Sequence, residues 1–198
     1  MLLRQLYVSL FDSSRFSEAL DIAEQAVQLG VLSDVLHQDA ARAALAAGRL
    51  EPSLEHLRTA ARVGPASRRA FHLWSLGGTL FLAARYSEAA AILHRAIRWA
   101  THDRSLYRAH FALARIAMGD RVDNLQEIVD SLRESATGRG YGQFLLGHIA
   151  YAANEWATAR KYLEAFLLHI EPGPFARRVS LAGELKMTRA TLAKISNN

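Results

Sequence analysis

The chain has 198 residues, 51% of them hydrophobic, a formal net charge of +5 and no cysteine. The lack of cysteine excludes disulfides, thiol nucleophiles and zinc–cysteine sites, and we expect a reducing, cytoplasmic location. No stretch approaches the roughly eighteen consecutive apolar residues of a membrane span, and the length leaves no room for a second globular domain beside one helical array.

Helices are expected along the whole chain, because apolar residues recur at helical spacing and no strand-like alternation is found. The opening segment, residues 1–10, is apolar but is interrupted by Arg4 and Gln5. It is therefore interpreted as a first helix rather than as a signal peptide. A second helix is expected at residues 17–28 and a third at 33–47, each followed by turn residues.

The clearest pattern lies in residues 71–101, which are typical of two amphipathic helices folded against each other. The first helix carries one apolar face at offsets of three and four, formed by Leu73, Leu76, Gly77 and Leu80. After a turn, the second helix repeats this spacing with Ala89, Leu93, Ala96 and Ile97. Because Gly77 and Ala89 are small, the two helix axes are expected to approach within about 8–10 Å.

The same arrangement returns at regular intervals. A large residue followed three positions later by a small one occurs at Phe16/Ala19, Leu50/Ser53, Tyr86/Ala89 and Trp156/Ala159. The small residues are 34, 36 and 70 positions apart, and the last gap leaves room for one more unit around residues 121–124. The sequence therefore predicts a repeat with a period near 35.

A two-helix repeat of this period resembles the tetratricopeptide repeat (TPR). The resemblance rests on Leu73, Leu76, Gly77, Leu80, Tyr86, Ala89, Leu93 and Ala96 in the third unit, on Leu146, Gly147, Trp156, Ala159, Leu163, Phe166 and Pro172 in the fifth, and on Gly48, Leu57, Ala60 and Pro65 in the second. The first and fourth units depart from the pattern, with Tyr7 and Ala112 in place of the small Gly and Asn124 in place of the Ala.

The resemblance implies an all-α, right-handed superhelical array of about five helix-turn-helix repeats over residues 1–173. The expected units are 2–33, 34–67, 68–103, 104–138 and 139–172, followed by a C-terminal capping helix within residues 174–198. Since the array begins almost at the first residue without a polar cap, we expect either part of a longer protein or a terminal face that makes contacts. The final helix, at 177–195, carries an apolar stripe formed by Leu181, Leu185, Thr188, Leu192 and Ile195.

In such arrays the first helices of successive units line a concave groove. The residues expected to face it are Arg4, Val8 and Phe11; Gln38, Arg42 and Leu45; Trp74, Gly78 and Phe81; Ala109, Leu113 and Ile116; and Phe144, His148 and Tyr151. Only Arg4 and Arg42 suit a carboxylate clamp, which is therefore disfavoured. The aromatic and aliphatic members instead favour the apolar side of a helix or peptide segment.

Other uses of these residues stay open. The groove is also compatible with a core filled by the chain's own side chains or its terminal helix, and with a homodimer interface. Trp99 and Trp156 are expected in the core at unit junctions. Arg clusters at 62–69 and 177–178 allow a nucleic-acid-associated regulator as an alternative.

No catalytic constellation is found, so an enzyme is not expected. The Gly-rich segment at 137–142 is interpreted as a hinge, because no Lys-Ser/Thr follows it and no strand precedes it. The eight His are scattered without ligand spacing, and no metal, cofactor or small-molecule substrate is expected. The sequence thus predicts a non-enzymatic adaptor or scaffold that docks an apolar or amphipathic helical segment of a partner, with Arg4 and Arg42 orienting an acidic end.

Overall fold

The computed structural model describes residues 2–30 and 33–197, and all regular structure within them is helical. Residues 1, 31–32 and 198, which fall in the predicted array and capping segment, lie outside the described residues. The helices are α1 (Leu2–Asp12), α2 (Phe16–Gln28), α3 (Ser33–Ala46), α4 (Leu50–Val63), α5 (Ala66–Leu82), α6 (Tyr86–Trp99), α7 (Arg104–Ala117), α8 (Leu125–Glu134), α9 (Tyr141–Ala152), α10 (Trp156–Ile170), α11 (Phe175–Ser180) and α12 (Ala182–Ser196), with a short 3-10 helix, η1 (Ala136–Gly138). None of the helices described has the length and hydropathy needed to cross a bilayer.

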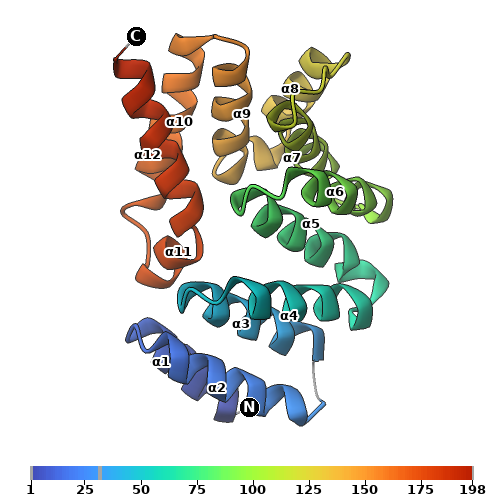
Figure 1. Ribbon diagram of the computed structural model, residues 1–198, viewed down its shortest axis with the longest axis vertical. Coiled ribbons are helices and arrows are strands. Elements are labelled where there is room, and N and C mark those ends of the chain that lie inside the picture. The colour runs from blue at the N-terminus through green and yellow to red at the C-terminus, as the bar shows by residue number, and fades with distance from the viewer. Residues whose placement is uncertain (1, 31–32, 198) are drawn as a thin grey trace.

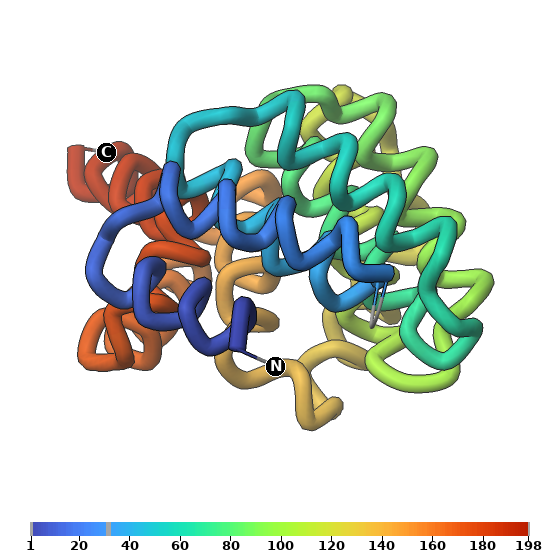
Figure 2. Tube along the Cα trace, turned by 90° about the horizontal axis from the view of Figure 1, so that it is seen from below, coloured from blue at the N-terminus to red at the C-terminus, as the bar shows by residue number. Residues whose placement is uncertain are grey.

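The first ten helices form consecutive pairs that follow one another around an arc (Figure 1). Each helix packs against the next, from α1 with α2 to α9 with α10. The arc is bridged at its open side, because α12 packs on α9 and α10 while α11 contacts α1 and α3. Seen from below, the N-terminal pair lies nearest the viewer and the C-terminal helices lie on one side (Figure 2).

In every pair, the turn between the two helices contains a residue with a left-handed backbone conformation. These residues are Ser14, Gly48, Ala84, Gly119 and Asn154, with φ between 58° and 86°. They follow one another at intervals of 34, 36, 35 and 35 residues, which matches the predicted period. A left-handed residue just after a helix satisfies the last free carbonyls and reverses the chain, so the five turns share one mechanism.

The helices of a pair are fitted together by a small and a large residue sixteen positions apart. In the third pair a Cβ atom on Gly77 would lie 2.6 Å from Leu93 Cγ, and in the fifth a Cβ atom on Gly147 would lie 2.6 Å from Leu163 Cγ. The corresponding buried positions in the other pairs are Ala41/Leu57, Ala112/Ile128 and Tyr7/Ala23. In the first pair the large residue is on the first helix and the small one on the second. Tyr7, which departs from the predicted pattern, is accommodated there because its counterpart on the second helix is the small Ala23.

The fourth pair is the irregular one. Seven residues separate α7 from α8, against three in each other pair, and α8 begins only at Leu125. In the Gly-rich segment that follows, two glycines lie very close to backbone carbonyl groups of the preceding residues. A Cβ atom on Gly138 would lie 2.3 Å from the Leu132 carbonyl oxygen, and one on Gly142 would lie 2.1 Å from that of Thr137. These glycines permit close packing of η1 and α9.

The single C-terminal helix expected at 177–195 is two helices. The chain breaks at Leu181, with φ −112° and ψ 20°, between α11 and α12. Of the predicted stripe, Leu185, Thr188 and Ile195 are buried. The helix α12 therefore covers the last pair, α9 and α10. The helix α11 has no buried residue and contacts α1 and α3 instead.

Candidate functional site: the central cavity

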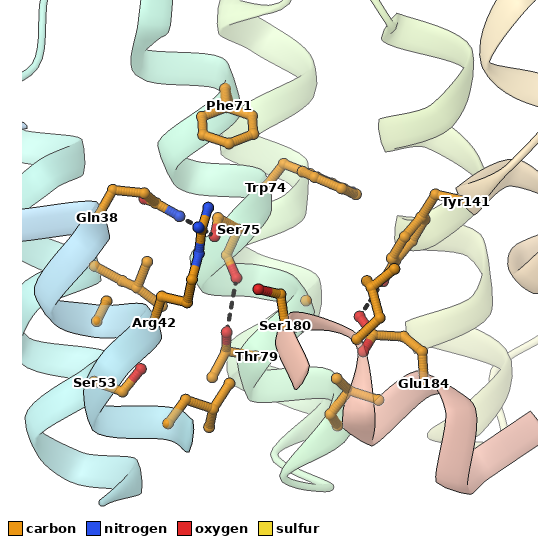
Figure 3. A pocket seen from close by; sticks show the side chains of 16 residues that line it. Gln38, Arg42, Ser53, Phe71, Trp74, Ser75, Thr79, Tyr141, Ser180 and Glu184 are labelled. Atoms are coloured by element: carbon orange, nitrogen blue, oxygen red, sulfur yellow. Dashed lines mark hydrogen bonds between the residues drawn. The ribbon is translucent and has the colours of Figure 1, made fainter. Parts of the chain in front are cut away.

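A cavity of about 250 Å³ lies between the inner helices of the arc and the C-terminal helices (Figure 3). We call it the inner cavity. Its lining comes from α3, α4, α5, α9, α11 and α12 and consists of Gln38, Ala41, Arg42, Leu45, Ser53, Leu57, Phe71, Trp74, Ser75, Gly78, Thr79, Leu82, Tyr141, Ser180, Leu181 and Glu184. It adjoins a channel of about 860 Å³, the wide channel, which shares Arg42 and Glu184 and extends to Phe16, Phe81 and Met187.

One wall of the inner cavity is held by a polar network that joins α3 to α5. Gln38 donates from Nε2 to Ser75 Oγ at 2.8 Å, and its Oε1 lies 3.2 Å from Nδ1 of the buried His72. The other ring nitrogen of His72 is 2.9 Å from Asp34 Oδ2. Arg68 donates to both oxygens of Asp34, at 2.7 and 2.9 Å. These bonds fix the spacing of the two inner helices.

The buried Asp34 is ionised by this network. The hydrogen bonds from Arg68, and secondarily that from His72, hold the pKa of its carboxyl below the ordinary value, at about 2, although burial acts in the opposite direction. A buried carboxylate with two such partners is a satisfied structural group. The network therefore supports the cavity wall without adding reactive chemistry to it.

Arg42 supplies a positive charge at the cavity. Its side chain extends from α3 into the space between the walls (Figure 3). Within residues 2–30 and 33–197 it has no salt bridge, and its guanidinium lies 6.0 Å from the centre of the Phe11 ring. Arg4, the other arginine expected to orient a ligand, is already engaged, since its Nε donates to Oδ2 of the buried Asp39 at 2.8 Å. Arg42 is thus the cavity's available anion-binding group.

A carboxyl and a phenol close the opposite wall. Tyr141, at the start of α9, donates from its hydroxyl to Oε1 of Glu184 at 3.1 Å. Glu184 is 6% exposed, and burial raises the pKa of its carboxyl to about 7. Burial also raises the pKa of Tyr141 well above its ordinary value, and the Glu184 carboxylate adds to this. The Glu184 carboxyl therefore gains or loses its proton near neutral pH, while the Tyr141 phenol stays protonated.

Two further polar atoms of the lining lack partners. The hydroxyl of Ser53, a residue 1% exposed, and the indole N–H of Trp74 are buried without any hydrogen bond to the described residues. An unpaired buried polar group costs roughly 1–3 kcal/mol. Because each of these atoms is itself covered by protein, they are an internal cost of the packing and are not offered to a ligand.

The wide channel is large enough to receive a ligand. Its volume of about 860 Å³ lies in the upper part of the roughly 300–1,000 Å³ that ligand pockets occupy. The inner cavity beside it, at about 250 Å³, is smaller.

Twelve of the fifteen predicted groove residues fall into three groups. Arg42 and Trp74 line the inner cavity, together with Gln38, Leu45 and Gly78, and Phe81 borders the wide channel. Phe11, Leu113, Phe144 and His148 are buried in the helix packing and line neither space. Ile116 and Tyr151 are half-buried away from both, and Tyr151 packs on Trp156 at 5.3 Å between ring centres. The inner face of the last two pairs is therefore filled largely by the chain's own packing, which is one of the alternatives that the sequence leaves open.

The histidines form no cluster within the described ranges that could bind a metal. His110 is buried among the rings of Trp74, Phe81 and Tyr141, and His148 lies 4.6 Å from the Phe144 ring centre. Burial lowers their pKa values to about 3 and about 4, so both are neutral near pH 7. In the part of the chain that the structure describes, no group of three or more His, Asp or Glu is placed to hold a metal ion.

Two tryptophans expected in the core are at the surface. Trp99 is 42% exposed and lies 4.5 Å under the Arg69 guanidinium, and Trp156 is 37% exposed. Of the Arg cluster at 62–69, Arg68 is paired with Asp34 and Arg69 stacks on Trp99.

Sequence reasoning did not identify Tyr141 or Glu184 as cavity residues. They are 43 positions apart, on the first turns of α9 and α12, and meet only because α12 folds back on the array. The one available signal was an acidic residue, Glu184, next to the apolar stripe of the last helix. Compared with models of known protein families and with curated proteins, the sequence matches none of them.

Proposed function

We propose that this protein is a non-enzymatic adaptor of the TPR type, in a right-handed superhelical arrangement, that holds a segment of a partner protein in the inner cavity and wide channel. The consecutive helix pairs and the 34 to 36-residue interval between their turns support the family assignment. A cytoplasmic location agrees with a chain that has no cysteine.

The observation that carries the proposal is Arg42. It is a guanidinium without an ion pair, within the part of the chain described, at a cavity otherwise lined largely by apolar and hydroxyl-bearing side chains. A partner carboxylate placed there would gain a charge-assisted hydrogen bond, and apolar residues beside it would cover Trp74 and Leu82. The partner segment is therefore acidic and apolar.

The proposal does not extend to catalysis or to nucleic acid. The polar groups at the cavity are one cation, one carboxyl–phenol pair and several hydroxyls, and the Asp34 network holds its members in structural bonds. Two arginines of the 62–69 cluster are similarly engaged by protein groups. Binding of a partner segment is the function that fits the groups at the cavity.

A displayed library of short random peptides tests the proposal, because it presents many sequences to the cavity and the partner need not be identified first. We expect wild-type protein to enrich peptides that combine an Asp or Glu with large apolar residues. The Arg42→Glu variant should lose the acidic preference, while Arg160→Glu, a charge reversal at an exposed position of α10, should keep it. Circular dichroism and the melting temperature check that both variants are folded. Absence of any enrichment on folded wild-type protein would overturn the proposal.

A further inference from the structure

The inner cavity carries opposite chemistry on its two walls. Arg42 projects from α3 on one side, and Glu184 with Tyr141 lies on the other, from α12 and α9 (Figure 3). The half-buried ring of Trp74 and the side chain of Leu82 also line the cavity. The two charged groups are not paired with each other.

We propose that the cavity recognises a dipolar segment, whose carboxylate binds Arg42, whose ammonium or guanidinium group binds Glu184, and whose apolar portion covers Trp74. This inference rests on the proposed function and names the partner chemistry that the site selects. Glu184 is then a second anchoring residue, on the helix that covers the array.

The reason lies in the surroundings of Glu184. Its carboxyl is buried, and its side-chain partner within residues 2–30 and 33–197 is a neutral phenol, with no salt bridge to Arg, Lys or His. Ionising such a carboxyl is costly without a cation nearby. A ligand cation supplies the missing charge.

The other charged or titratable groups near Glu184 do not compensate it. On the helices packed around it, His110 and His148 are neutral above pH 5 because burial lowers their pKa values to about 3 and about 4. Arg189 of α12 itself pairs with Glu171 at the end of α10, and Arg177 of α11 donates to His169. Lys186 and Arg178 are exposed.

The first experiment compares selection of displayed random peptides on wild type, Glu184→Gln and a matched control, Glu164→Gln, at an exposed position of α10. We expect wild type and the control to enrich peptides with an acidic and a basic residue separated by apolar ones. Glu184→Gln, which retains a hydrogen-bond acceptor for Tyr141, should lose the basic preference and keep the acidic one. An acidic and apolar consensus without a basic residue on wild type would overturn this inference while leaving the proposed function standing. No enrichment at all would overturn both.

The second experiment measures the affinity of one selected peptide, free of histidine and blocked at both ends, at pH 6 and pH 8. If the peptide's cation binds the Glu184 carboxylate and lowers its pKa by about two units, the affinity should rise about tenfold from pH 6 to pH 8. Binding should also release protons near pH 7, as seen by calorimetry in buffers of different ionisation enthalpy. In Glu184→Gln the affinity should be independent of pH over this range. An affinity that is unchanged with pH in wild type would contradict the role of Glu184.

Discussion

Gly77 on α5 lies directly against Leu93 on α6, so closely that a Cβ atom on Gly77 would be 2.6 Å from Leu93 Cγ and 2.8 Å from Cδ2. The same relationship holds between Gly147 and Leu163 in the fifth pair. In both pairs the glycine lets a leucine of the second helix reach into the first. The helix axes are thereby brought close together, and the size of one residue determines which residue fits at the other.

Substituting Gly77→Ala should therefore destabilise the protein. In an unconstrained helix the change would add up to about 1 kcal/mol, but the overlap with the buried Leu93 should cost about 2–3 kcal/mol. The expected net loss of about 1–2 kcal/mol in the free energy of unfolding can be measured by urea denaturation.

The control for this prediction is the same substitution in a Leu93→Ala background. With the leucine removed the overlap disappears, so Gly77→Ala should there be neutral or stabilising. A loss of the same size in both backgrounds would show that the substitution acts through something other than Leu93.

The left-handed turn residues can be tested by substituting an alanine by glycine in one turn and a glycine by alanine in another. Ala84 has φ 58°, a left-handed conformation that is costly for a residue with a Cβ atom, whereas Gly48 holds the same place in the second pair with φ 75°. We expect Ala84→Gly to raise the free energy of unfolding by about 0.5–1 kcal/mol and Gly48→Ala to lower it by about 1 kcal/mol. Nothing lies within 4 Å of a Cβ atom built on Gly48, so crowding does not contribute. Thermal melts of the two variants should shift in opposite directions, and shifts of the same sign would contradict a common turn conformation.

The helices and their pairing could be predicted from the sequence because they depend on local patterns. The apolar spacing of Leu73, Leu76 and Leu80 and the small residues at Gly77 and Ala89 act within one pair, and the all-helical, paired arrangement is confirmed. The period near 35 also agrees with the spacing of the left-handed turns. Each of these features is encoded within one repeat length.

The inner surface could be predicted only in part, since it depends on how tightly the pairs pack and on what covers them. Arg42 and Trp74 reach the cavity, whereas Phe144 is buried against Phe166, with ring centres 5.6 Å apart. A helical face that points inward at this spacing looks the same in sequence whether it is open or covered. The break at Leu181, which sends α11 toward α1 and α3, has no proline or glycine at the break itself to signal it.

The Asp34 network should give the protein an acid-sensitive step in stability. Because hydrogen bonds from Arg68 and His72 lower the pKa of Asp34 from 3.8 to about 2, the folded state holds this proton more weakly than the unfolded state. The resulting stabilisation is fully present above about pH 4 and is lost as the pH falls toward 2. Asp34→Asn should remove that part of the pH dependence while lowering stability at pH 7. The free energy of unfolding measured from pH 5 to pH 2 tests this, and Asp21→Asn, at an exposed position of α2, should leave the slope unchanged.

The bridging helix α11 should open more readily than its neighbours. None of its six residues is buried, and it is held by limited contacts such as the stacking of Phe175 on Phe16, with ring centres 6.4 Å apart. Local unfolding is easiest where few apolar contacts are lost. Hydrogen exchange followed by mass spectrometry should show residues 175–180 exchanging before those of α12, which buries Leu185 and Ile195. Equal protection of the two helices would indicate that α11 is an integral part of the closed arc.

The Glu184 carboxyl should make the protein less stable above neutral pH. Its pKa is raised by burial from 4.5 to about 7, so between these values the folded state binds the proton more tightly than the unfolded state, and stability falls as pH rises through that window. Glu184→Gln keeps the shape and the acceptor for Tyr141 but cannot ionise. The variant should resemble wild type near pH 4.5 and exceed its free energy of unfolding by roughly 2–3 kcal/mol above pH 8. Urea denaturation at pH 5 and pH 8 measures the difference, with Glu164→Gln as the exposed control. A Glu184→Gln variant less stable than wild type at both pH values would contradict the raised pKa of Glu184.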